Sequence, residues 1–131
     1  MNVQPTSTFR LLPLCLSLLI LVACGDSSEF KSALKRARAD DAQAQLELAQ
    51  MYMHGKGTKQ SETEARKWCE KAAAKGLPVA QRIYGTMLRD AYGAEVRDIP
   101  KAREWLTKAA EQGDAQAKAE LAVTPSLPAA K

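Results

Sequence analysis

The sequence is poor in the residues with which most enzymes carry out acid, base and metal chemistry. Its 131 residues include one histidine and three cysteines, and aromatic residues make up only 5%. A lone imidazole without cysteine or carboxylate partners at ligand spacing does not form a metal site. His54 and Cys69 could supply a base and a nucleophile, but the second copy of the repeat described below has Asp90 and Leu106 at these positions. We therefore expect no enzymatic activity, no metal and no cofactor.

A strong excess of charge of either sign is also missing. Lysine and arginine number 19 and the acidic residues 15, a net charge of +4. Residues 1–23 contain only Arg10 among these, so the rest of the chain carries 18 − 15 = +3. Nucleic-acid-binding proteins usually concentrate a larger positive charge in one stripe. We expect no nucleic-acid partner.

The first 23 residues have the pattern of a signal peptide. Arg10 precedes an apolar run over residues 11–22, which Pro13 interrupts. A basic start followed by a short apolar run is typical of secretory signals. The run is shorter than the roughly 20 apolar residues of a membrane-spanning helix. We expect residues 1–23 to be removed.

The run ends in Leu21–Val22–Ala23–Cys24, which resembles the lipobox of bacterial lipoproteins. The resemblance implies that Cys24 becomes the first mature residue and carries lipid. Stable anchoring needs more than one acyl chain, and the lipid of this family supplies them. Residues 24–28 would form the lipidated N-terminus and a short tether, with Ser28 capping the next helix. We expect a periplasm-facing protein of the bacterial cell envelope. Gly25 after the cysteine favours the outer membrane over the inner, and the alternative is an ordinary secreted protein.

Cys69 has no disulfide partner within the predicted mature chain. Cys15 leaves with the signal peptide and Cys24 carries lipid. Cys69 could form a disulfide with another protein, but its counterpart in the second unit is Leu106, so a packing role is favoured.

The segment after the tether predicts an amphipathic helix over residues 29–39. Two faces are distinguished at helical spacing: Phe30, Leu34 and Ala37 lie on one, and Lys31, Lys35 and Arg38 lie on another. The basic face either contacts anionic lipid headgroups or is simply solvated.

The remainder of the chain is an internal repeat. Residues 66–76, RKWCEKAAAKG, return at 103–113 as REWLTKAAEQG. The full units are 41–76 and 77–113, preceded by a half repeat over 29–40 and followed by another over 114–123, so the repeat domain covers residues 29–123. Residues 124–131 contain two prolines that cannot continue a helix, and we expect a disordered tail.

Each unit predicts two helices. The first helix of each carries one apolar stripe: Ala44, Leu48, Met51 and Tyr52, then Ala80, Tyr84, Met87 and Leu88. The second helix starts near Ser61 or Asp98, which are good N-caps. It ends at Gly76 or Gly113, where glycine can adopt the left-handed conformation.

The pattern Ala44–x₃–Leu48–Ala49–x₂–Tyr52–x₂–Gly55–x–Gly57–x₇–Ala65–x₂–Trp68–x₂–Lys71–Ala72–Ala73–x₂–Gly76 resembles the Sel-like repeat of the tetratricopeptide-like proteins. The resemblance implies an all-α fold, a short right-handed α-solenoid of antiparallel helix pairs. The second unit has Ala91 in place of the first loop glycine and one extra residue, which leaves the conformation of that loop open.

In such solenoids the first helix of each pair lines the concave side. Opposite the apolar stripe we predict an exposed, partner-binding line: Gln43, Leu46, Gln50 and Met53 in the first unit, and Arg82, Ile83, Thr86 and Arg89 in the second. Arg82 and Arg89 would suit an acidic or carboxylate group of a partner. The alternative is that terminal helices of the same chain cover this line.

These features favour a non-catalytic envelope lipoprotein that binds another envelope or periplasmic protein through the concave face of its repeats. The alternative function is a periplasmic immunity protein that neutralises a toxic effector such as a phospholipase. The lipid on Cys24 supplies the contact with the membrane in both cases.

Overall fold

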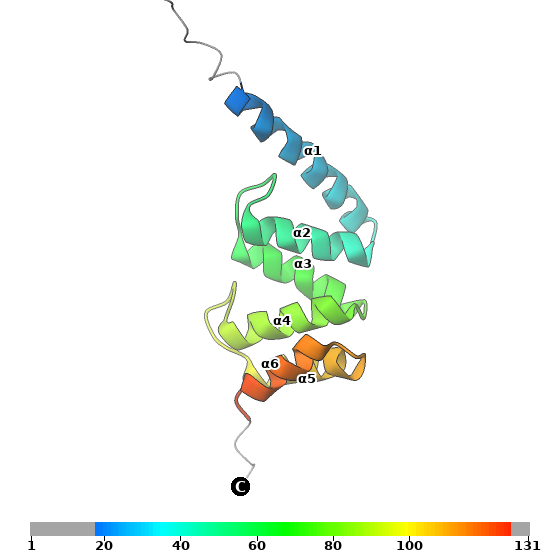
Figure 1. The fold of residues 1–131 in the computed structure, drawn as a ribbon, viewed down its shortest axis with the longest axis vertical. Helices are drawn as coiled ribbons and strands as arrows, with labels where there is room; N and C mark the ends of the chain where they lie inside the picture. The colour runs from blue at the N-terminus through cyan, green and yellow to red at the C-terminus, as the bar shows by residue number, and fades with distance from the viewer. Residues whose placement is uncertain (1–17, 127–131) are drawn as a thin grey trace, which may run out of the picture.

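The computed structural model describes residues 18–126 of the chain, with side chains described from Ser27 onward. This part of the chain forms six α-helices, arranged in sequence order as a stack (Figure 1). They are α1 (Leu18–Arg38), α2 (Ala42–His54), α3 (Glu62–Ala74), α4 (Pro78–Asp90), α5 (Ile99–Glu111) and α6 (Ala115–Val123).

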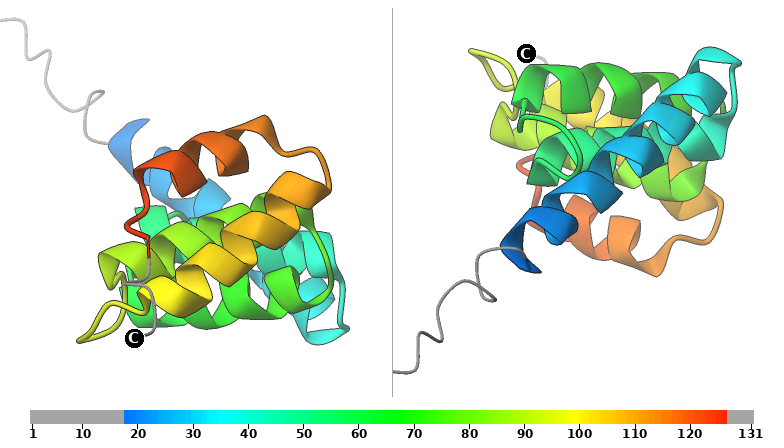
Figure 2. Two further views of the ribbon diagram at one scale, coloured as in Figure 1. Left: turned by 90° about the horizontal axis from the view of Figure 1, so that it is seen from below. Right: turned by 90° about the horizontal axis from the view of Figure 1, so that it is seen from above.

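Each helix packs against the next one in the chain, with α1 at one end of the stack and α5 and α6 at the other (Figures 1 and 2). Residues 18–126 contain no strand. The predicted all-α solenoid is confirmed. Among these residues, none of the helices combines the length and the apolar character that crossing a bilayer requires.

The helix boundaries follow from side-chain caps and left-handed residues. Four cap side chains accept a bond from the amide three residues later: Asp41, Ser61, Asp98 and Asp114. The predicted caps at Ser61 and Asp98 are confirmed. Gly76 and Gly113 have φ of 90° and 94°, as predicted for the residue after a helix.

The prediction of a tether over residues 24–28 is wrong in this structure. Helix α1 begins at Leu18 and runs without a break through these residues, so Ser28 lies inside the helix rather than at its cap. No proline interrupts residues 18–38, and the single Gly25 lowers helix stability by only about 1 kcal/mol. The signal peptide over residues 1–23 stays a prediction, and residues 1–17 of it lie outside the described residues.

The core forms where small side chains let adjacent helices approach closely. The predicted packing stripe of α2 is confirmed, because Ala44 and Leu48 are fully buried. Gly85 lies so close to α5 that a β-carbon there would sit 2.8 Å from Cγ of Leu106. Such contacts hold the helices at a short, fixed spacing.

Cys69 is a packing residue, as predicted. Its side chain is fully buried in the main core cluster, and its thiol lies 3.6 Å from the carbonyl oxygen of Ala80. Burial raises the pKa of the thiol to about 12. The group stays protonated and inaccessible, which does not suit a nucleophile.

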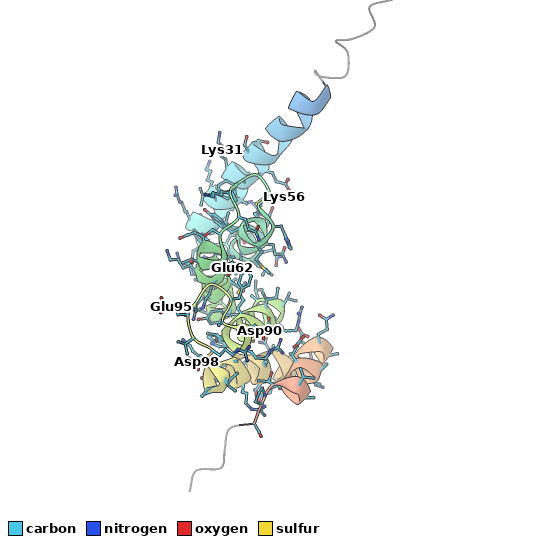
Figure 3. The ribbon with its side chains drawn as sticks, turned by 90° about the vertical axis from the view of Figure 1, so that its left-hand side faces the viewer. Lys31, Lys56, Glu62, Asp90, Glu95 and Asp98 are labelled. Carbon is cyan, nitrogen blue, oxygen red and sulfur yellow. The ribbon has the colours of Figure 1, made fainter. Side chains whose placement is uncertain are left out.

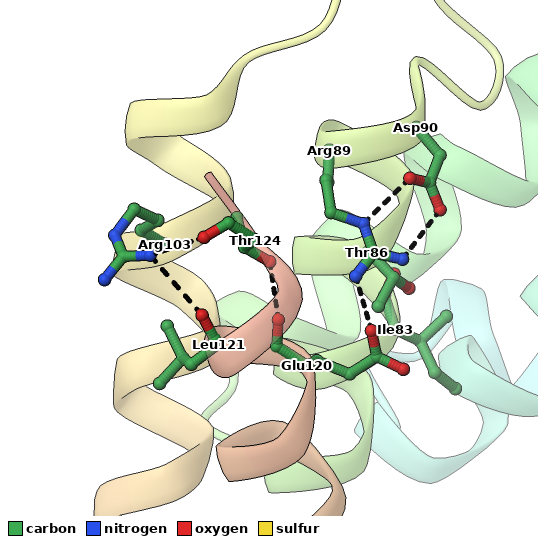
Figure 4. Close-up of polar contacts among 8 residues, drawn as sticks. All are labelled: Ile83, Thr86, Arg89, Asp90, Arg103, Glu120, Leu121 and Thr124. Carbon is green, nitrogen blue, oxygen red and sulfur yellow. Dashed lines mark hydrogen bonds and ion pairs between the residues drawn. The ribbon is translucent and has the colours of Figure 1, made fainter. Parts of the chain in front are cut away.

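The chain remains ordered just beyond α6. Thr124 is only 4% exposed, and its hydroxyl donates to the carbonyl oxygen of Glu120 at 2.6 Å. Arg103 of α5 donates to the carbonyl oxygen of Thr124 at 2.9 Å (Figure 4). The predicted disordered tail is therefore wrong at Thr124, while residues 127–131 fall outside the described residues.

A buried glutamine joins successive repeats. Gln45 and Gln81 occupy the same position of α2 and α4, and each donates from Nε2 to a carbonyl of the preceding helix pair: Ala37 at 3.2 Å and Ala73 at 3.4 Å. Oε1 of Gln81 accepts a bond from Gln112 at 2.7 Å. The position of Gln112 is occupied by Lys75 in the first unit, and Oε1 of Gln45 is buried without a partner.

This asymmetry predicts opposite effects of two substitutions. Gln112→Ala removes the partner of a buried amide oxygen and should lower the free energy of unfolding by about 1 kcal/mol. Lys75→Gln should raise it by less than about 1 kcal/mol, because it offers Gln45 the donor that Gln81 already has but removes the exposed ion pair of Lys75 with Asp40. Urea unfolding measures both, and Gln116→Ala on the exposed surface of α6 serves as the control. Equal stability of Gln112→Ala and Gln116→Ala would contradict this account.

Candidate functional site

Three of the predicted partner-binding residues meet in one hollow between α2 and α4. Met53, at the end of α2, faces Ile83 and Thr86 of α4 across a space of about 210 Å³. Met87, Asp90 and Tyr92 complete its lining, and we call it the α2–α4 hollow. Met53, Ile83 and Tyr92 are only partly buried and pack on the main core cluster. Both repeats therefore contribute apolar surface to one solvent-facing depression.

The other predicted residues of α2 divide into surface and core. Gln43 and Gln50 are exposed. The expectation that Leu46 is exposed is wrong, because it is only 5% exposed and belongs to the main core cluster. Helix α2 packs against α1 on one side and α3 on the other. The buried surface of α2 is therefore wider than the single apolar stripe that the sequence predicts.

Arg82 and Arg89 of α4 are held within the chain by α6. Nε of Arg82 lies 3.1 Å from a carboxylate oxygen of Asp114. Arg89 pairs with Asp90 at 2.8 Å and also with Glu120 of α6 (Figure 4). The terminal helix thus covers part of the predicted line, which is the alternative considered from the sequence. An acidic partner would have to displace Asp114 or Glu120.

The same contacts order the rim of the hollow. The Thr86 hydroxyl donates to the carbonyl oxygen of Ile83 at 2.7 Å. The guanidinium of Arg89 lowers the pKa of Asp90, so Asp90 is a carboxylate at neutral pH. Its side chain is 57% exposed. The hollow therefore has an apolar floor and, on its edge, the ion pair of Asp90 with Arg89.

Tyr92 was not predicted, and the loop between α4 and α5 positions it. Ala91 takes the left-handed conformation, with φ of 58°, that Gly55 takes in the first unit. The backbone N–H of Tyr92 donates to the carbonyl oxygen of Met87 at 2.9 Å. The only signal in the sequence was that the two units differ here in residue type and loop length. This finding settles the loop conformation that the sequence left open.

Gly93 holds this loop against the start of α3. A β-carbon on Gly93 would lie 2.5 Å from the carbonyl oxygen of Glu62, closer than real contacts allow. The N–H of Gly93 donates to the Glu62 carboxylate at 3.3 Å. Burial, together with the charge of Glu62, raises the pKa of Tyr92. The hydroxyl of Tyr92 therefore stays protonated and can donate a hydrogen bond.

The loop edge beside the hollow carries several acidic side chains. Figure 3 shows Glu62, Asp90, Glu95 and Asp98 along the edge formed by the α2–α3 and α4–α5 loops. Asp98 serves as the cap of α5. Among residues 27–126, no group of three or more metal-ligating side chains is placed to hold an ion. Of these acids, Asp90 is the one that lines the α2–α4 hollow.

A larger depression lies on the outer face of α3 beside Trp68. It measures about 440 Å³, and four charged residues line it together with Trp68 and Ala74. Lys67 pairs with Glu64 at 2.8 Å, and Nζ of Lys71 lies 4.3 Å from the ring centre of Trp68. Lys67 and Lys71 thus already interact with Glu64 and Trp68 of the same helix. The α2–α4 hollow is the better candidate because both repeats contribute to it and because Met53, Ile83 and Tyr92 give it partly exposed apolar side chains.

The contact at Gly93 generates a prediction with a matched control. Gly93→Ala should lower the free energy of unfolding by about 2–4 kcal/mol, since it adds a clash with Glu62 to the cost of a left-handed alanine. Gly76→Ala meets open space at a similar φ and should cost only about 1 kcal/mol. Chemical denaturation measures both. Equal losses would show that the loop does not press on α3.

Comparison with known proteins supports the repeat architecture. The Sel1 repeat family model matches residues 42–77 and 78–114. A solved Sel1 repeat protein from Oxalobacter formigenes is 38% identical, with a TM-score of 0.63 over 66% of this chain and 64% of that chain. A protective antigen of uropathogenic Escherichia coli strains with an SLR fold is 33% identical, with a TM-score of 0.71 over 74% of this chain and 21% of that chain.

A curated relative extends the comparison to a eukaryote. Chitin synthase regulatory factor 3 of Schizosaccharomyces pombe is 35% identical over 89 residues, which are 66% of this chain but 9% of that protein. The chain thus spans a small part of this relative. Sel1 repeat proteins generally act in protein–protein interaction. Because the matched repeats cover more than half of the sequence, the chain belongs to the Sel1 repeat family.

Proposed function

We propose that the protein is a non-catalytic lipoprotein of the bacterial cell envelope that binds another envelope or periplasmic protein at the α2–α4 hollow. The observation that carries this proposal is the convergence of Met53, Ile83 and Tyr92, partly exposed apolar side chains from both repeats, on one depression. Apolar anchors in a pocket with a polar rim are typical of the centre of protein interfaces.

The arrangement favours an apolar side chain of the partner as the group that enters the hollow. Its volume of about 210 Å³ is larger than a single leucine or phenylalanine side chain, and the floor offers thioether and aliphatic contacts. Arg82 and Arg89 are neutralised by Asp114 and Glu120. Hydrophobic contact rather than capture of a carboxylate therefore carries the binding in this proposal.

The envelope location rests on Cys24 and the apolar run before it. Lipid on that cysteine would hold the domain at a membrane surface, where the partner is confined to the same layer. Confinement raises the effective concentration of the two proteins. A hollow of modest size can then support binding that would be weak in free solution.

Replacing Ile83 with glutamate tests the hollow. Ile83→Glu places a charge on its apolar floor and should reduce the partner adduct formed by amine-reactive crosslinking in intact cells by at least about tenfold. Val96 is a β-branched residue 76% exposed on the loop, so Val96→Glu makes a similar change outside the hollow and should leave the adduct unchanged.

Thermal unfolding must show that both variants remain folded before their adducts are compared. Equal adduct yields from two folded variants would exclude the hollow as the binding site. The identity of the crosslinked protein decides the role: a toxic effector would indicate an inhibitor, and a resident envelope protein would indicate a scaffold.

A further inference from the structure

Helix α1 carries both the predicted lipid-attachment position, Cys24, and three basic residues. Because α1 is one unbroken helix from Leu18 to Arg38, its register is continuous through Cys24. Lys31, Lys35 and Arg38 follow Cys24 by 7, 11 and 14 residues. At about 100° per residue, these steps return to within roughly 20°, 20° and 40° of the starting direction. The register therefore places Cys24 and the three basic residues in one row along the helix.

The opposite side of the helix is the one that packs on α2. Ala33 and Ala37 are 0% and 2% exposed, and their register positions lie roughly 140° to 180° from Cys24 and roughly 100° to 160° from the three basic residues. Lys31, Lys35 and Arg38 are all exposed. We call these three residues the basic row. Lys31 and Lys35 lie on the exposed side of α1, whereas Arg38, at the end of the helix, also borders a depression lined by Gln45 and Trp68. Helix α1 forms one end of the stack (Figure 1).

The basic row is not neutralised within the described part of the chain. None of the ion pairs found among residues 27–126 involves its three members. The other charged residues of α1 with described side chains point elsewhere: Glu29 pairs with Lys56 at 3.0 Å, and Arg36 pairs with Glu47 at 2.6 Å. The only acid of α1 with a described side chain is thus directed to α2 and its loop. Figure 3 shows Lys31 at the end of the stack that α1 forms.

We propose that α1 lies along the membrane surface and that the basic row contacts anionic phospholipid headgroups. The proposal rests on the lipidation of Cys24, which is part of the proposed function. Lipid chains entering the bilayer from Cys24 would bring the same side of the helix against the headgroups. Each cation near an anionic surface adds a modest attraction, and the lipid anchor on Cys24 turns three modest contacts into a defined orientation.

The distances distinguish a helix that lies flat from one that stands upright. Lys31 is about 10 Å and Arg38 about 21 Å from Cys24 along the helix axis. In an upright helix, Arg38 would be about two and a half Debye lengths from the surface at physiological salt, where its attraction is largely screened. A flat helix brings the whole basic row within reach. Helices α2 to α6 then extend away from the membrane, and the α2–α4 hollow is open to a neighbouring protein.

Lysine reactivity in vesicles tests this orientation. The purified lipidated protein is placed in vesicles of phosphatidylcholine, with or without phosphatidylglycerol, and treated with a water-soluble acylating reagent. Acylation of Lys31 and Lys35, measured by mass spectrometry, should slow at least about threefold in the anionic vesicles and recover at high salt. Lys59 and Lys101, exposed residues outside α1, should react equally in both. Equal reactivity of Lys31 and Lys35 in the two vesicle types would overturn the proposal.

A pair of arginine variants provides the matched control. Arg38→Gln leaves both lysines in place and should weaken their protection, because it removes one cation of the basic row. Arg97→Gln removes an equal charge from an exposed loop position and should not change it. Loss of protection in both variants, or in neither, would contradict a specific role for the basic row.

Failure of the anchor can be told apart from failure of the orientation. The intact mass of the purified protein and its flotation with neutral phosphatidylcholine vesicles report lipidation, and Cys24→Ala should abolish both signals. If the protein without any substitution shows neither the lipidated mass nor flotation, both the lipid anchor and this proposal are wrong. If the protein floats but Lys31 and Lys35 stay fully reactive in anionic vesicles, the anchor stands and only the proposed orientation falls.

Discussion

Close approach of neighbouring helices at alanine and glycine positions is the constraint on which the rest of the structure depends. Ala65 and Ala72 of α3, and Ala102 and Ala109 of α5, are fully buried. Gly85 of α4 has no room for a β-carbon against Leu106. The short spacing fixes how far each repeat is translated from the one before. It therefore decides that Met53 of one repeat faces Ile83 of the next across a hollow of defined size.

The repeated residues form the scaffold, and the residues that differ between the repeats form the site. Cys69 and Leu106 occupy one position and are both fully buried. Trp68 and Trp105 likewise share a position, each with a lysine ammonium over its ring. By contrast, Tyr92 belongs to the loop in which the second unit departs from the first in length. Residues that are the same in both repeats are mostly packing residues. Functional residues should therefore be sought at the positions where the repeats differ.

Much of the fold could be predicted from local patterns because these patterns act over one or two helical turns. The caps at Ser61 and Asp98, the apolar stripe through Ala44 and Leu48, and the left-handed glycines all lie where the spacing indicated. The hydrophobic period is repeated in every pair of helices. Each copy of the repeat therefore provides separate evidence for the same pair of helices.

The site could be predicted only in part because its decisive contacts join distant positions. Arg82 pairs with Asp114 and Arg89 pairs with Glu120, over separations of 32 and 31 residues. No local spacing shows that α6 would supply these acids. Leu46 is buried by packing against other helices. Helix α1 continues through Cys24, where the sequence predicted a tether. These features determine which charges remain available for a partner or a membrane.

The central claim is that partner binding lies on the face of α2 and α4 rather than on the repeated outer helices. Photo-crosslinking in living cells tests it most directly, with the same photoreactive residue placed at Thr86 in the α2–α4 hollow or at Thr107 on the exposed surface of α5. The account predicts one protein crosslinked from position 86 and absent from position 107. The same protein crosslinked from position 107 and not from position 86 would contradict it.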